Sequence, residues 1–111
     1  MLRNVARCLQ SNLRRTDAIG RYGGEEFVFF LSEVEIEEGV RISDKLREFV
    51  AGLEVPIADL QPPLRVTVSI GIAGWRGEDE TLTAAILVER ADRALYRAKA
   101  GGRNRVEVEG A

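Results

Sequence analysis

Two adjacent carboxylates, Glu25 and Glu26, follow a pair of glycines, Gly23 and Gly24, directly ahead of the apolar run from Phe27 to Leu31. Carboxylate oxygens are the protein ligands that Mg2+ prefers, so the pair could hold a divalent cation. Glycines let the backbone approach a ligand closely. The plainer interpretation is that both carboxylates are solvated turn residues, because charged side chains usually lie at the surface. The residues alone therefore leave two alternatives, a cation site and a polar turn.

The glycine pair also predicts a β-hairpin. Ala18 to Tyr22 can be extended, and the run from Phe27 to Leu31 is rich in strand-forming residues. A two-residue turn between such strands needs positive φ at its centre, which Gly23 and Gly24 adopt without a Cβ clash. Because the second strand is apolar on both faces, we expect it to be covered on both sides.

The composition is that of an ordinary soluble globular domain. The 111 residues are 45% apolar and 31% charged, with a net charge of -2, which indicates neither a nucleic-acid polymer nor an anionic membrane as a partner. A single cysteine, Cys8, and the absence of histidine exclude an internal disulfide and a zinc-type ligand set within the chain. We expect one domain, residues 1–111, without a membrane span or secretory leader, in a reducing cytoplasm.

Apolar spacing places two helices in the first half of the chain. Met1 to about Leu13 has apolar residues on one helical face, and a second helix is predicted from about Ile36 to Leu53. The inner face of the second helix is expected to carry Ile42, Leu46, Phe49, Val50 and Leu53. Gly52 and the prolines that follow end this helix and begin a loop.

The second half alternates strand, helix and strand. Leu64 to Ala73 has period-2 alternation, which predicts one strand. A third helix should be capped by Asp79 or Thr81 and should bury most of Tyr96. Its inner positions are Val88, Ala91, Leu95 and Ala98. Gly101 or Gly102 ends it, and Arg105 to Glu109 forms a short last strand, with Asn104 and Arg105 fixing the turn before it.

Four motifs in fixed order resemble the GGDEF family of diguanylate cyclases. Gly23 to Phe27 resembles the GG[D/E]EF signature, and Arg14-Arg15-Thr16-Asp17 resembles the RxxD motif, with five residues between Asp17 and Gly23 as in the family. Val66 to Ala73 resembles the "vTvSiGiA" strand, and Ala91 to Val106 resembles the "ADxALYxAKxxGRNrv" ending. The resemblance covers nearly the whole chain.

The resemblance implies an enzyme that condenses two GTP into cyclic di-GMP and pyrophosphate by two-metal phosphoryl transfer with Mg2+ or Mn2+. The resemblance makes Glu25 a metal ligand that can assist deprotonation of the attacking ribose 3'-hydroxyl, with Glu26 supporting the same site. Gly23 and Gly24 would lie against the nucleotide. The competing hypothesis is a module that binds cyclic di-GMP without turning over GTP.

Two further pairs of residues gain roles from the resemblance. Lys99 and Arg103 match positions that contact GTP phosphates, although cations at a helix C-terminus are favoured by the helix dipole even without a ligand. Arg14 and Asp17 match the inhibitory product site, although an arginine and an aspartate three residues apart could form only a solvated local pair.

The implied fold is α+β, a ferredoxin-like or adenylyl-cyclase-like palm with an antiparallel sheet flanked by helices. In the family, a strand and a helix precede the first segment and carry an acidic metal site and guanine contacts. We therefore expect the chain alone to have little or no cyclase activity and to leave a strand edge unpaired. A second GGDEF domain and an upstream sensor or receiver domain are the expected protein partners.

Overall fold

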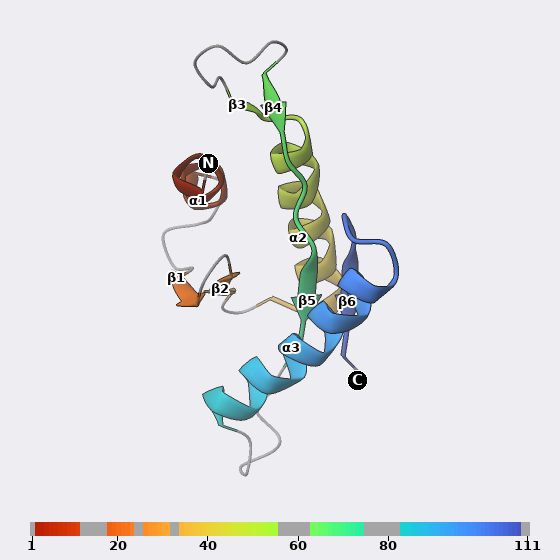
Figure 1. The fold of residues 1–111 in the computed structure, drawn as a ribbon. Coiled ribbons are helices and arrows are strands. Elements are labelled where there is room, and N and C mark those ends of the chain that lie inside the picture. Colours follow the sequence, from red (N-terminus) through yellow and green to blue (C-terminus); the bar gives the residue numbers. More distant parts are fainter. Residues whose placement is uncertain are drawn as a thin grey trace.

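The computed structural model describes most of the chain, and Figure 1 shows the arrangement of its elements. The described residues are 2–11, 18–23, 26–31, 34–55, 63–74 and 83–109. In chain order the elements are α1 (Leu2–Ser11), β1 (Ala18–Gly23), β2 (Glu26–Phe30), α2 (Ile36–Ala51), β3 (Glu54–Val55), β4 (Leu64–Arg65), β5 (Ile70–Ile72), α3 (Ala84–Ala100) and β6 (Val106–Val108). The described elements confirm all three predicted helices.

The main apolar core lies between α1 and α2. Val5 and Leu9 of α1 and Leu46 and Val50 of α2 are all buried and form one cluster. Their positions four residues apart in each helix put each pair on one face. Burying each such side chain contributes about 1.5–3 kcal/mol, so this contact holds α1 against α2.

The prediction that the side chains of Phe49 and Tyr96 are buried is wrong. Phe49 is 46% exposed and Tyr96 is 74% exposed. With 3.6 residues per turn, Phe49 lies roughly a quarter of a turn from the centre of the buried stripe of α2. Tyr96 lies midway between the buried Ala94 and Ala98, so its side chain leaves the opposite face of α3.

The predicted β-hairpin is present. β1 and β2 pair antiparallel, from Ala18 opposite Phe30 to Gly23 opposite Glu26, with an irregularity between Arg21 and Gly23. Within the described residues, the extensive contacts of the hairpin are between its own two strands.

β5, α3 and β6 form a strand, helix, strand unit. β5 and β6 are parallel, with Ile70 opposite Val106 and Ile72 opposite Val108. Parallel neighbours need a crossover connection, and α3 supplies it. Figure 1 shows the two strands side by side, with α2 running along them and α3 crossing them. This pairing corrects the expectation of an antiparallel sheet, which holds for β1–β2 and for β3–β4.

The predicted strand from Leu64 to Ala73 is divided in the structure. β4 pairs with β3, β5 pairs with β6, and residues 66–69 between them belong to no strand. Alternation of side chains still describes the segment, because Val66 and Val68 pack against the α1–α2 core while Gly71 faces α3. Alternation predicts extended backbone with two faces, whereas a strand also requires a hydrogen-bonded neighbour.

The start of α3 corrects a second prediction. Thr83 is the N-cap, and its Oγ1 accepts a hydrogen bond from the backbone N–H of Ile86 at 3.2 Å. The cap was predicted at Asp79 or Thr81, both of which lie outside the described residues. Gly101 ends the helix as predicted.

Candidate functional site

The hairpin turn places Glu26 at the first position of β2. Gly23 is opposite Glu26, so the residues between the paired positions are Gly24 and Glu25, which lie outside the described residues. This pairing puts Gly23 at the end of a strand, whereas the sequence predicted it in the turn itself. The donor set, two consecutive carboxylates, has the hard oxygen chemistry that suits Mg2+ or Mn2+.

Other predicted site residues fall beyond the described structure. Arg14 and Asp17, the predicted inhibitory pair, are among them. Within the described part of the chain, no group of three or more His, Cys, Asp or Glu side chains is placed to bind a metal. The assignments of Glu25, Arg14 and Asp17 therefore stay predictions.

The second predicted cluster lies at the C-terminus of α3. Gly102 has φ of 121°, and its N–H donates to Lys99 O at 3.4 Å, while Arg103 N–H donates to Ala98 O at 2.9 Å. These are the two hydrogen bonds of a Schellman motif, which satisfies the last carbonyls of the helix. The side chains of Lys99 and Arg103 are both exposed at this negative end of the helix dipole. Two cationic side chains therefore lie together at this end of α3.

The chain leaves the Schellman motif through an unusual turn. Arg103 has φ of 64° and Asn104 has φ of 48°, so two non-glycine residues in succession adopt the left-handed conformation. Such residues are uncommon, although asparagine tolerates the conformation better than most. We call residues Gly101–Arg105 the basic turn, because it carries Arg103 and Arg105.

Strand β5 and the residue before it, Ser69, hold the basic turn from one side. Ser69 Oγ accepts a hydrogen bond from Asn104 N–H at 3.1 Å. Next along the chain, Ile70 N–H donates to Arg105 O at 2.9 Å. These bonds confirm the prediction that Asn104 and Arg105 fix the turn into the last strand.

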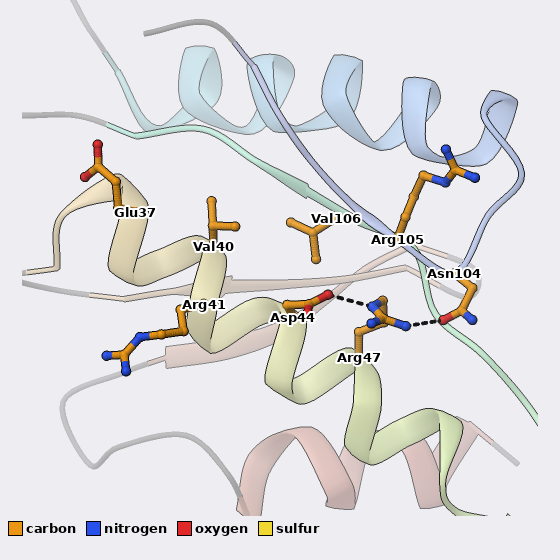
Figure 2. A pocket seen from close by; sticks show the side chains of 8 residues that line it. All are labelled: Glu37, Val40, Arg41, Asp44, Arg47, Asn104, Arg105 and Val106. Atoms are coloured by element: carbon orange, nitrogen blue, oxygen red, sulfur yellow. Dashed lines mark hydrogen bonds and ion pairs between the residues drawn. The ribbon is translucent and has the colours of Figure 1, made fainter.

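Helix α2 holds the basic turn from the other side. Arg47 Nη1 donates to Asn104 Oδ1 at 2.8 Å, and Arg47 Nε donates to Asp44 Oδ1 at 2.8 Å. Figure 2 shows both bonds beside an open pocket of about 430 Å3 between α2 and β6. The hydrogen bond to Asp44 raises the pKa of Arg47 above its usual value. The pocket is lined by Glu37, Val40, Arg41, Asp44, Arg47, Asn104, Arg105 and Val106.

The end of β6 is tied to α3 by a charged pair. Arg97 forms an ion pair with Glu109 and also donates to Val108 O at 2.7 Å. The hydrogen bond from Arg97 lowers the pKa of Glu109, with further attraction from Arg93 and Arg90. These contacts fix the strand that leaves the basic turn.

The structure thus gathers Lys99, Arg103, Asn104 and Arg105 at one end of α3, while Gly23 and Glu26 lie on the hairpin. The described contacts of α3 are chiefly with β5 and β6. Sequence reasoning missed Arg47 and Ser69 as supports of the turn. Arg47 lies 57 residues from Asn104, and its spacing from Asp44 indicates only a local pair within the helix.

Comparison with known proteins decides the family. The family model "Diguanylate cyclase, GGDEF domain" matches residues 1–105. The chain belongs to the GGDEF diguanylate cyclase family. It is 42% identical over 106 residues to the response regulator PleD of Caulobacter vibrioides, covering 96% of this chain and 23% of PleD. The chain therefore spans about a quarter of this curated relative.

Solved GGDEF structures share the fold. The GGDEF domain of DgcB from Caulobacter crescentus, in complex with c-di-GMP, matches with a TM-score of 0.87 and 28% identity, over 99% of this chain and 63% of that one. The active GGEEF domain of a diguanylate cyclase from Vibrio cholerae matches with a TM-score of 0.84 and 26% identity, over 99% and 67%. The chain therefore has the mixed α/β GGDEF fold. Among the described residues, no helix has both the length and the hydropathy that a membrane span requires.

Proposed function

We propose that the chain is the catalytic part of a diguanylate cyclase, which condenses two GTP into cyclic di-GMP with release of two pyrophosphates. The observation that carries the proposal is the family match over residues 1–105 together with the unbroken run Gly23 to Phe27. The solved Vibrio cholerae domain, described as active, has a GGEEF signature of the same residue types. These findings support retained catalytic chemistry.

Glu25 and Glu26 are proposed to hold Mg2+ or Mn2+ at the hairpin. The bound cations would supply charge neutralisation at the α-phosphate and at the pyrophosphate leaving group. Glu25 is further proposed to accept the proton of the ribose 3'-hydroxyl that attacks. Gly23 and Gly24, without side chains, would leave room for the nucleotide.

Lys99 and Arg103 are proposed to bind the GTP phosphates. Both side chains are exposed, and among the described residues no carboxylate forms an ion pair with Arg103. A guanidinium can donate two parallel hydrogen bonds to phosphate oxygens, and an ammonium acts as a point charge. The helix end itself is negative, so these cations offset a field that would otherwise repel phosphate.

Arg14 and Asp17 are proposed to form an inhibitory site for cyclic di-GMP, in which Arg14 contacts a guanine and a phosphate and Asp17 accepts hydrogen bonds from guanine. Two such domains, each with one GTP, would face each other during the reaction. A sensor or receiver domain would control that pairing. The solved SiaD cyclase in complex with its activator SiaC shows that one GGDEF cyclase has a protein activator.

A second function is favoured by the solved complex of a DgcB domain with c-di-GMP. The chain could serve as a binding module for cyclic di-GMP without turnover of GTP. GTP turnover with Mg2+ and cyclic di-GMP binding, measured on the purified chain and on the complete product of its gene, separate the two functions. Formation of cyclic di-GMP by either protein supports the cyclase. Binding of cyclic di-GMP without turnover in both supports the binding module.

A further inference from the structure

Arg47 joins two parts of the molecule that are far apart in the sequence. Its side chain is only 18% exposed and is held by Asp44 through Nε, with Glu48 Oε1 at 3.8 Å from Nη2. The remaining nitrogen, Nη1, reaches Asn104 in the basic turn. One planar guanidinium therefore connects α2 to the turn, as Figure 2 shows.

The basic turn needs such support. Arg103 and Asn104 both have positive φ, a conformation that costs free energy for residues with a Cβ. Backbone of this kind persists only where its surroundings over-determine it. Ser69 fixes the backbone N–H of Asn104, and Arg47 fixes the side-chain oxygen of the same residue. Asn104 is therefore held at two points, by α2 and by the residue that precedes β5.

The conformation of this turn decides where Arg103 points. Arg103 lies between Gly102 and Asn104, so a change of φ at Arg103 or Asn104 would redirect its guanidinium. Lys99 lies on the last turn of α3, whose final hydrogen bonds include Arg103 N–H to Ala98 O. Loss of the turn would therefore loosen both cations.

We propose that Arg47 is a positioning residue for phosphate binding: it locks the basic turn through Asn104 and thereby orients Arg103 and Lys99 toward the triphosphate of GTP. The inference rests on the proposed function, because the phosphate role of these two cations belongs to it. A lysine at position 47 would keep the charge but could not present the same planar fork to Asp44 and Asn104 together.

Two readouts test the proposal on the purified chain, namely amide hydrogen exchange resolved by NMR and affinity for GTP with Mg2+. In Arg47→Gln we expect at least tenfold faster exchange at Arg103 N–H and Ile70 N–H, no change at Leu53 N–H, and about tenfold weaker GTP binding. Leu53 N–H bonds to Val50 O at the end of α2, away from the turn. Arg47→Lys should not rescue GTP affinity.

Arg41→Gln is the matched control. Arg41 lies on the same helix, lines the same pocket and pairs with Glu38 of its own helix. The Arg41→Gln substitution removes one positive charge, as Arg47→Gln does, but breaks no contact with the basic turn. Amide hydrogen exchange and GTP affinity should therefore stay at wild-type values. Equal effects of the Arg41 and Arg47 variants would overturn the proposal, because they would show that Arg47 acts only through its positive charge and not through its contact with Asn104.

Asn104→Gly removes the same hydrogen bond from the side of the acceptor. The backbone of the turn should keep its conformation in this variant, because glycine accepts positive φ. The double variant Arg47→Gln, Asn104→Gly should exchange no faster than the more affected single variant, since each removes the same interaction. Additive effects would overturn the link.

Arg103→Gln separates this proposal from the proposed function. If Arg103→Gln weakens GTP binding but Arg47→Gln does not, the positioning role is overturned while the phosphate site stands. If neither variant changes GTP binding, the phosphate site itself is wrong and the inference falls with it.

Discussion

Gly71 of β5 lies directly against the backbone of Leu95 in α3. A Cβ added at Gly71 would stand 2.8 Å from Leu95 Cα, and closer still to Leu95 N and Ala91 O. Because backbone atoms cannot move aside as a flexible side chain can, only glycine permits this approach. The contact between strand and helix sets the position of α3 and therefore of the basic turn at its end.

Gly71→Ala should therefore destabilise the chain. Overpacking typically costs about 1–3 kcal/mol. Urea unfolding followed by circular dichroism measures the change. Gly39→Ala is the control, because a Cβ at position 39 meets nothing within 4 Å. This substitution should stabilise α2 by about 0.5–1 kcal/mol, since alanine is favoured over glycine inside a helix. A Gly71 variant as stable as wild type would show that α3 does not pack as described.

Leu46→Ala tests the core between α1 and α2. Leu46 is 2% exposed, so its truncation should cost about 2–5 kcal/mol of unfolding free energy. Phe49→Ala, on the same helix but half exposed, should cost less in the same urea titration. The reverse order would contradict the packing of α2 and restore the sequence-based assignment of Phe49 to the inner face.

Thr83→Ala removes the N-cap of α3. The Oγ1 of Thr83 accepts from Ile86 N–H, and loss of such a cap costs about 0.5–2 kcal/mol. Thr83→Ser keeps the hydroxyl and should stay within a few tenths of a kcal/mol of wild type. The melting temperatures of the two variants and of wild type measure these changes. Equal destabilisation by both substitutions would show that the Thr83 hydroxyl does not cap α3.

The pair between Arg97 and Glu109 predicts a dependence of stability on pH. The pKa of Glu109 is lowered in the folded chain, so the unfolded state binds its proton more readily. The pair therefore stabilises the fold above the ordinary carboxyl pKa of about 4.3 and loses this contribution as pH falls through the folded pKa. In Glu109→Gln the fall in melting temperature between pH 7 and pH 3 should be smaller than in wild type. An identical fall in both would contradict the assignment.

The sequence predicted the elements well because periodicity reports which side of an element faces apolar neighbours. It placed α2 and α3, the hairpin and the last strand. It erred on Phe49 and Tyr96, because an aromatic residue was assigned to the core although its helical position lies off the buried stripe. It also merged β4 and β5 into one strand, because alternation carries no information about which neighbour each residue pairs with.

The candidate site could be predicted in part. Lys99 and Arg103 were found through the resemblance, and the structure places both at one exposed helix end. The link from Arg47 to Asn104 depends on how α2 packs beside β6, which no local pattern records. Glu25, Arg14 and Asp17 lie outside the described residues, so their roles stay predictions.

The central claim is that Glu25 carries out cyclase chemistry, and GTP turnover tests it most directly. The complete product of the gene is incubated with GTP and Mg2+, and cyclic di-GMP is followed by chromatography. We expect product from wild type. Glu25→Gln should lower the turnover rate by about a hundredfold or more, since a metal-binding carboxylate contributes several kcal/mol to stabilising the transition state. Glu89→Gln, an exposed position paired with Arg93 on α3, should retain wild-type turnover. Equal turnover by wild type and the Glu25 variant, or no product from wild type, would contradict the account.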